Sequence, residues 1–196
     1  MSSVVDICNS ALNQIGASNI ISLTEDSKAA RICNQRYDFI RDSVFRAHPW
    51  NSLTTRVSLA PDTAAPVFEF TKQFTLPTDP FCLRVLGLSD ANILYRVEGR
   101  KLLCNESTIQ MIFIGRVTDI NEYDTLLIET LAAALAADLA YPLVGSQALT
   151  SNMYSLYQTK LTEARFVDAT EDNQINTSVV NESRQVAADT FINSRF

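Results

Sequence analysis

Residues 122–144 read EYDTLLIETLAAALAADLAYPLV and form the most apolar stretch of the chain. Leucines recur at every fourth position, and alanines fill most of the places between them (Leu127, Leu131, Leu135, Leu139). A helix that is apolar on nearly all sides is buried, and its small side chains let neighbouring helices approach closely. The stretch therefore predicts a central helix against which the other helices of the protein pack.

Two acids and a proline argue that this helix does not span a membrane. A span needs about 20 apolar residues with few charges, whereas Glu129 and Asp138 interrupt this run and Pro142 is expected to end it. An unpaired carboxylate at Asp138 would be costly among apolar neighbours. Either an Arg or Tyr on an adjacent helix pairs with Asp138, or Asp138 is a functional acid. We favour the pairing.

Length and charge restrict the class of protein. A chain of 196 residues that is 46% hydrophobic predicts one domain, or one domain with an insert. Residues 1–50 carry five basic and five acidic side chains, and residues 51–121 carry seven of each. Residues 122–196 carry four and ten, and so account for the net charge of −6. This balance argues against a conventional nucleic-acid binder. An acidic surface suits a channel through which DNA slides, and it suits any acidic protein equally well.

The cysteines do not have the spacing of a metal site. Four are present, without a CxxC pair and far in sequence from the one histidine (Cys8, Cys33, Cys82, Cys104). Cys8 and Cys33 fall on apolar helix faces, which predicts buried, unreactive thiols. The N-terminal residues lack the features of a secretory signal peptide, so we expect cytosolic synthesis with reduced thiols. No cofactor or metal site is predicted.

The lone histidine lies in the sequence His48-Pro49-Trp50-Asn51. It could be a catalytic or ligand-binding residue, or it could pack at a helix end that Pro49 terminates. We favour packing, because neither a second histidine nor a Cys or Ser motif accompanies it. No catalytic residue is predicted.

Three further helices are expected over residues 4–15, 24–47 and 146–169. Ser3 and Asp6 have the spacing of a helix-capping pair. The second helix has an apolar stripe at helical spacing on one face. Its other face is charged and is either solvated or in contact with another subunit (Arg31, Gln35, Asp38, Arg41, Asp42, Arg46).

On that charged face, Asp42 and Arg46 are four residues apart and predict an ion pair along the helix. In the last helix Tyr154 and Tyr157 follow a helical spacing. Aromatic residues in such an arrangement indicate core or interface positions rather than a cofactor site.

Between residues 53 and 117 the apolar period changes from 3.6 to 2, which predicts five or six short antiparallel strands. Glu98-Gly99 between two apolar runs indicates a hairpin. Phe68, Phe70, Phe74 and Leu76 are expected to point to one face.

The predicted fold class is α+β, mainly α. Residues 1–50 and 121–173 are expected to form a four-helix bundle, and residues 51–120 a small antiparallel β domain inserted into it. Residues 174–196 are polar with isolated apolar positions, and are either a tail or an extended arm that orders against a partner. The apolar positions favour an arm, and we assign them to an interface (Ile175, Val179, Val180, Phe191, Ile192, Phe196).

Several stretches of the chain occur together in a characteristic order. They are VVDICNSALNQIGASNIISLTEDSKAARICNQRYDFIRDSVFRAHPWN (4–51), RVSLAP (56–61), YRVEGRKLLC (95–104), the alanine-rich helix followed by LVGS (143–146), and EARFVDA (163–169). In this order they resemble the tail tubular protein A family of short-tailed bacteriophages and prophages, over residues 4–172. The aromatic residue that tends to follow the HPWN box in that family is replaced here by Ser52 and Leu53. No family motif matches the C-terminal arm.

The resemblance implies a head-to-tail adaptor in the virion tail. Proteins of this family form a ring of about twelve copies under the portal protein and join it to the tail nozzle protein and tail fibres. Double-stranded DNA passes through the ring without specific binding. The family fold is a helical bundle with an inserted β domain. No membrane partner is expected.

Three functions remain open from the sequence. The first is a structural ring protein, in which acids near the end of the chain line the channel and keep DNA from adhering (Glu163, Asp168, Glu171, Asp172). The second is a tail-associated glycosidase that degrades cell walls, which would need two carboxylates flanking a sugar; no motif marks such a pair. The third is a soluble interaction module unrelated to virions. We favour the first, and we expect no enzymatic activity.

Overall fold

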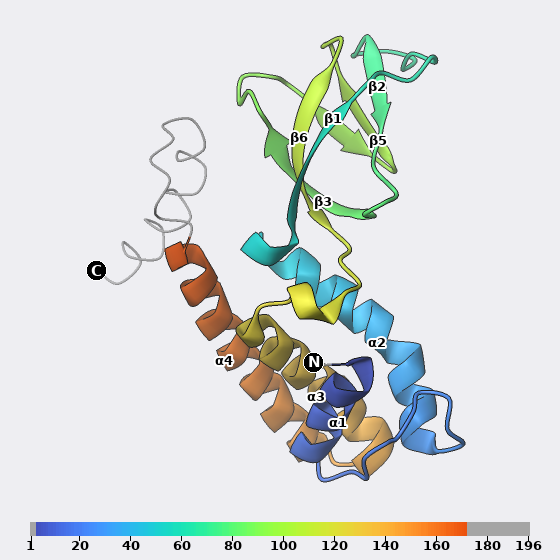
Figure 1. Cartoon of the computed structure of the whole chain (residues 1–196), viewed down its shortest axis with the longest axis vertical. Coiled ribbons are helices and arrows are strands. Elements are labelled where there is room, and N and C mark those ends of the chain that lie inside the picture. The colour runs from blue at the N-terminus through green and yellow to red at the C-terminus, as the bar shows by residue number, and fades with distance from the viewer. Residues whose placement is uncertain (1–2, 172–196) are drawn as a thin grey trace.

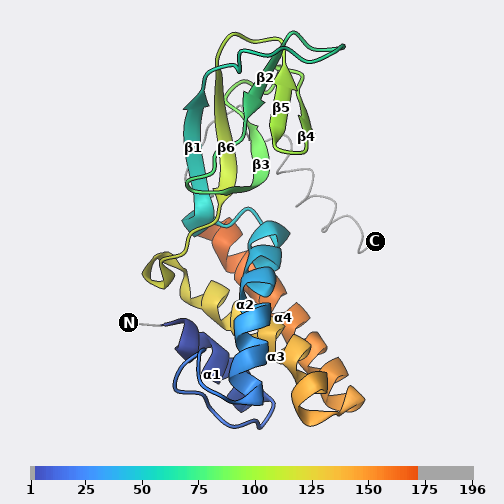
Figure 2. The ribbon, with the colours of Figure 1, turned by 90° about the vertical axis from the view of Figure 1, so that its right-hand side faces the viewer.

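The structure, a computed structural model, describes residues 3–171 and shows an α+β fold (Figure 1). Within these residues four helices and six strands occur in one order: α1 (Val4–Gln14), α2 (Lys28–Ala47), β1 (Thr54–Leu59), β2 (Lys72–Thr75), β3 (Cys82–Leu88), β4 (Arg96–Glu98), β5 (Lys101–Cys104), β6 (Ile109–Gly115), α3 (Thr125–Val144) and α4 (Gln147–Glu171). The strands lie together at one end of the molecule and the helices at the other (Figure 2). The arm expected over residues 174–196 lies outside the described residues.

The capping pair at the start of α1 is confirmed. The Ser3 hydroxyl accepts a hydrogen bond from the Asp6 backbone N–H at 3.2 Å, and the Ser3 N–H donates to the Asp6 carboxylate at 2.8 Å. This reciprocal arrangement satisfies two N–H groups that a helix start otherwise leaves unpaired.

The second helix begins four residues later than its apolar period predicts. Ser27 is its N-cap, because the Ser27 hydroxyl accepts from the Ala30 N–H at 3.1 Å. Residues 24–27 form turns instead, since Ser22 and Thr24 hydrogen-bond locally and compete with helix formation. At the other end Pro49 holds His48 in an extended conformation, which ends the helix as expected.

Helix α3 is the centre of the helical part, and α1, α2 and α4 all contact it. Ten of its twenty residues are buried, which confirms the central helix predicted from the leucines and alanines. The helix continues through Pro142 to Val144, where the apolar stretch predicts its end, and Gly145 closes it with a φ of +72°. Among the described residues, α3 alone is long and apolar enough to cross a membrane, and about half of it is buried against the rest of the protein.

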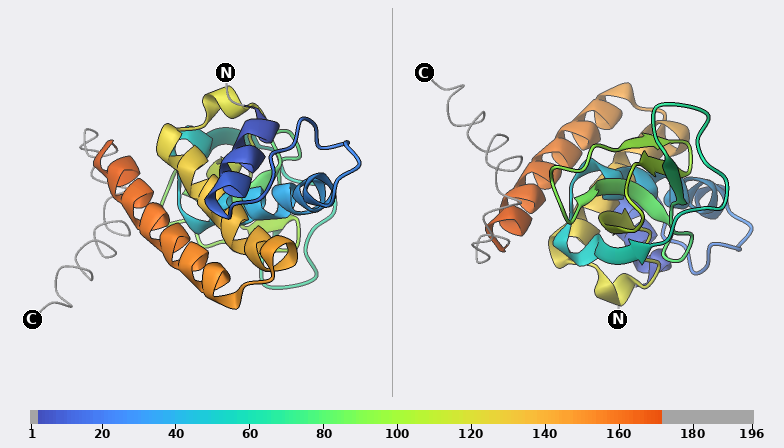
Figure 3. Two further views of the ribbon diagram at one scale, coloured as in Figure 1. Left: turned by 90° about the horizontal axis from the view of Figure 1, so that it is seen from below. Right: turned by 90° about the horizontal axis from the view of Figure 1, so that it is seen from above.

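Helix α4 has a very different environment from α3. It runs along the outside of the helical part (Figure 3), and only Leu161 and Ala164 of its 25 residues are buried. It contacts α3 along much of its length. Most of its remaining surface is exposed to solvent.

The strands form two three-stranded antiparallel sheets, in the orders β1-β6-β3 and β2-β5-β4. Buried side chains from both sheets form a hydrophobic cluster of their own, and these are Phe74, Leu76, Cys82, Leu88, Leu102, Cys104, Ile109, Met111 and Phe113. The expected hairpin joins β4 to β5, where Gly99 takes a φ of +57°. Successive side chains of a strand point to opposite faces, so β3 and β6 contribute to two cores. Leu83 and Ile114 belong to the second hydrophobic cluster, which is formed mainly by the helices.

One predicted strand position is wrong. Phe68 does not point inward with Phe74 but is 77% exposed in the connection between β1 and β2. Glu69 has a φ of +71° there, and the chain turns sharply before β2 begins at Lys72. A residue in the left-handed region breaks the period of two on which the prediction depended.

Candidate functional site

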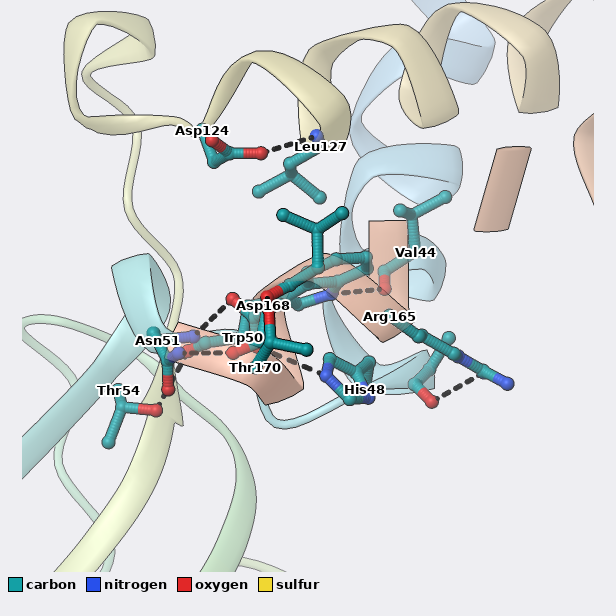
Figure 4. Close-up of polar contacts among 12 residues, drawn as sticks. Val44, His48, Trp50, Asn51, Thr54, Asp124, Leu127, Arg165, Asp168 and Thr170 are labelled. Carbon is teal, nitrogen blue, oxygen red and sulfur yellow. Dashed lines mark hydrogen bonds and ion pairs between the residues drawn. The ribbon is translucent and has the colours of Figure 1, made fainter. Parts of the chain in front are cut away.

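The helices and the strands meet at a junction where the ends of α2 and α4 approach the start of β1. Trp50 is fully buried there and donates its indole N–H to the Val44 carbonyl at 3.0 Å (Figure 4). The His48 ring packs edge-on against Trp50 with centroids 4.9 Å apart. The HPWN box therefore packs at a helix end, as the sequence predicts.

Asp168 of α4 joins this junction from the far end of the chain. One carboxylate oxygen lies 3.1 Å from His48 Nε2, and the other accepts the Asn51 backbone N–H at 3.0 Å. The Asn51 side chain donates in return to the Asp168 carbonyl at 2.8 Å (Figure 4). Arg165, one turn earlier, donates to the Ala47 carbonyl at 2.7 Å. The last turns of α4 are thus fastened to the end of α2.

This geometry corrects the interpretation of Asp168 as a channel-lining acid. Its side chain is only 11% exposed and both carboxylate oxygens are occupied. A carboxylate that accepts internal hydrogen bonds at such a site stabilises the junction and presents little free charge to a passing ligand. Asp168 is a structural residue.

The junction does not form a catalytic relay. Asp168 faces the His48 nitrogen Nε2, and the adjacent Ser52 hydroxyl is buried and makes no hydrogen bond. A serine nucleophile needs a hydrogen-bonded base to take up its proton. Within residues 3–171, no group of three or more His, Cys, Asp or Glu side chains could hold a metal ion.

A second set of contacts ties α2 to the strands. Asp42 pairs with Arg41 at 2.9 Å and with Arg116, which follows β6. The Arg116 guanidinium also lies over one ring, that of Phe81, at 4.5 Å from its centroid, and Arg100 lies over the same ring at 3.9 Å. Cations placed over the face of an aromatic ring are attracted to it. These contacts fix the angle between the helices and the strands.

The ion pair predicted between Asp42 and Arg46 is wrong. Arg46 turns toward β3 and donates to the Leu83 carbonyl, while Arg84 donates back to the Arg46 carbonyl at 3.2 Å. Arg41, assigned to the charged outer face, is buried. Helical spacing predicts only partners on the same helix, whereas the partner of Arg46 lies on a strand.

The acid in α3 has the kind of partner that the sequence predicts. Arg36 of α2 donates to both carboxylate oxygens of Asp138, at 2.7 and 2.9 Å. The hydrogen bond and charge of Asp138 raise the pKa of Arg36. Asp138 is 28% exposed, so it sits at the edge of the core rather than within it.

The other candidate channel residues lie on α4 or beyond it. Glu163 is exposed, with its carboxylate 3.9 Å from the Lys160 ammonium. Glu171 is exposed at the last described position. Asp172 lies outside the described residues, as do the arm positions assigned to an interface: Ile175, Val179, Val180, Phe191, Ile192 and Phe196.

The four cysteines are buried and form no disulfide, and for Cys8 and Cys33 this burial was expected. The Cys33 thiol and burial together raise the pKa of Cys8, and burial raises the pKa of Cys82 and Cys104. Raised pKa values leave little thiolate at neutral pH, so these three thiols are inert.

An apolar groove lies between α2 and α4, with α3 as its floor, and it was not predicted from the sequence. It encloses about 490 Å³. Ile40 and Val44 line one wall, Tyr154 and Tyr157 line the other, and Ala137 lies on the floor. The aromatic spacing on α4 indicated core or interface positions, but no signal in the sequence shows that α2 and α4 leave a space between them.

Comparison with known proteins adds no assignment. Models of protein families give no match to the chain. A search of curated proteins gives none either.

Proposed function

We propose that this chain is the structural head-to-tail adaptor of a short-tailed phage, a ring subunit that joins the portal to the tail nozzle. The observation that carries the proposal is the order of elements: two helices, six strands and two helices within residues 3–171. That order agrees with the family architecture implied by the resemblance, in which a β domain is inserted into a helical bundle. We accordingly interpret α1 to α4 as a four-helix bundle and residues 51–120 as its inserted domain.

The junction contacts support a structural role. A ring subunit that bridges two partners must hold its two parts at a constant angle, because a shift of one part would displace the surface that the other part presents to its partner. Asp42–Arg116, Arg84–Arg46 and Asp168–Asn51 link the helices to the strands or their flanking turns through separate hydrogen bonds. Multiple independent links of this kind resist hinge motion.

The channel proposal is now narrower. Glu163, Glu171 and Asp172 are proposed to face the lumen, and Asp168 is removed from the set. Exposed carboxylates would repel the DNA phosphates and let the genome slide without specific binding. An electron-microscopy map of the ring that placed Glu163 and Glu171 on the outer wall would remove the channel proposal.

The assembly experiment tests the main proposal. The purified protein is mixed with the portal protein of the same virus and imaged by electron microscopy. We expect a ring of about twelve copies on the portal, and a protein that stays unbound would overturn the adaptor assignment. The His48→Ala protein is not a suitable control, because it disturbs the junction. The exposed Ser107→Ala variant, in the loop between β5 and β6, leaves the helical surface intact.

Deletion of residues 174–196 tests the arm. Among the described residues, the buried members of the hydrophobic clusters lie between residues 7 and 164. We expect deletion to abolish ring formation while the melting temperature of the monomer stays nearly unchanged. A large fall in melting temperature would instead show that the arm belongs to the core.

A further inference from the structure

The surface around the groove lacks charge to an unusual degree. Residues 141–159, from the end of α3 through the first half of α4, contain no Asp, Glu, Lys, Arg or His. Yet Tyr141 and Tyr154 are 59% and 58% exposed. An outer helix face that stays in solvent normally carries charged residues. Depletion of charge together with exposed tyrosine is typical of the centre of a protein interface.

The groove itself favours an apolar, neutral occupant. Ile40, Ala137 and Tyr154 present carbon atoms to it from three different helices. Among the described residues that line it, Asp138 alone is charged, and its carboxylate is already held by Arg36. Phe39, next to Ile40 on α2, is largely exposed and extends the apolar area beyond that wall.

The C-terminal residues have the matching composition. Residues 190–196 read TFINSRF, with three large apolar side chains, one base and no acid. Such a segment brings apolar area to the groove and places no acidic side chain beside Asp138. Residues 172–196 are 25 in number, and an extended segment of that length reaches about 80 Å. The distance along α4 from Glu171 back to Tyr154 is about 26 Å, so the segment is long enough to reach a groove at that distance, in its own subunit or in a copy lying beside it.

We propose that the groove between α2 and α4 binds residues 190–196 of a neighbouring copy of the chain. This inference rests on the proposed ring function and names the receptor for the arm. A ring requires two different, complementary patches on each subunit, because its contacts run head to tail. The groove is one patch, and the segment that leaves the opposite end of α4 is the other.

Cysteine cross-linking tests the contact. Ser151 lines the groove, and Ser194 lies within the proposed ligand segment. The single variants Ser151→Cys and Ser194→Cys, with tags of different size, are mixed with the portal protein and oxidised with copper phenanthroline. The native thiols are buried, so they should not cross-link one chain to another. We expect a disulfide between the two differently tagged chains.

Ser155→Cys is the matched control. Ser155 is exposed on α4, one turn beyond Ser151, and does not line the groove. We expect it to cross-link to Ser194→Cys at least tenfold less. Equal yields from the two positions would overturn the proposal, because contact would then be unspecific. In the Ser151→Cys background, Phe196→Ser in the partner should reduce the yield by a similar factor.

Two further outcomes separate the inference from the function on which it rests. Rings seen by electron microscopy without a Ser151 cross-link would overturn the groove proposal and leave the adaptor assignment in place. Absence of rings would overturn both. A double Ser151→Cys/Ser194→Cys protein that closes an internal disulfide without portal, and gives none between chains in the ring, would show that each arm occupies its own groove.

Discussion

Helices α3 and α4 are consecutive and similar in length, yet the protein uses them in opposite ways. Half of α3 is buried and it contacts all three other helices, whereas α4 buries two residues and leaves the uncharged surface of its first half in solvent. The difference teaches that helix formation and helix burial are separate properties. One helix holds the fold together, and the other leaves most of its surface in solvent.

The largest expected effect is at the centre of α3. Leu131→Ala removes a fully buried side chain and should lower the free energy of unfolding by about 2–5 kcal/mol. Tyr154→Ala on α4 is the contrasting variant and should change it by less than about 1 kcal/mol. Urea unfolding of both proteins measures the difference. Similar losses would break the contrast between the two helices.

Asp168 is expected to stabilise the fold, although α4 is mostly exposed. Asp168→Ala removes the acceptor of the Asn51 N–H and the partner of His48, which should cost about 1–3 kcal/mol. For a chain of this size, that is a fall in melting temperature of roughly 2–12 °C. Glu163→Ala, on the same helix but exposed, should leave the melting temperature nearly constant. If Asp168→Ala behaves like Glu163→Ala, the junction carries no stability.

Asp138 is expected to contribute little to stability, although half of α3 is buried. Because Asp138 and Arg36 are 28% and 44% exposed, solvent screens their ion pair, and its coupling energy should be no more than about 1 kcal/mol. A double-mutant cycle with Asp138→Ala and Arg36→Ala measures it, and the value should fall in high salt. A coupling above about 3 kcal/mol would mean that the pair is effectively buried.

The smallest effect is expected on the outer face of α4. Phe166→Ser removes a mostly exposed side chain, and Phe and Ser have similar helix propensities, so stability should change by less than about 0.5 kcal/mol. Leu161→Ala, at one of the two buried positions of α4, should cost more than 1 kcal/mol. Circular dichroism during thermal unfolding compares them. A large loss for Phe166→Ser would show that α4 packs more closely than its exposure indicates.

Local patterns were predictable wherever a few neighbouring residues decide the structure. The capping pair of Ser3 and Asp6, the extended His48 before Pro49 and the turn at Gly99 were all expected and are confirmed. Such features depend on steric preferences and on hydrogen bonds within four residues. The start of α2 at Lys28 was missed, because the preceding turns satisfy their own hydrogen bonds.

Contacts between distant residues were predictable in kind but not in identity. The sequence indicates that Asp138 needs a cationic or hydroxyl partner, and Arg36 supplies it from 102 positions away. For Asp42, local spacing pointed to Arg46, whereas Arg116 and Arg41 are the partners found. The lone His48 was correctly interpreted as packing, but nothing near it in the sequence points to Asp168.

By itself, the sequence determined the α+β class, the order of elements and the burial of α3, because hydrophobic period and turn residues act over short distances. Only the tertiary structure decided that Asp168 closes the junction, that Arg41 is buried, and that α2 and α4 leave a groove above α3. These features arise where segments far apart in the chain meet. Their energies depend on distance in space, which a sequence pattern does not contain.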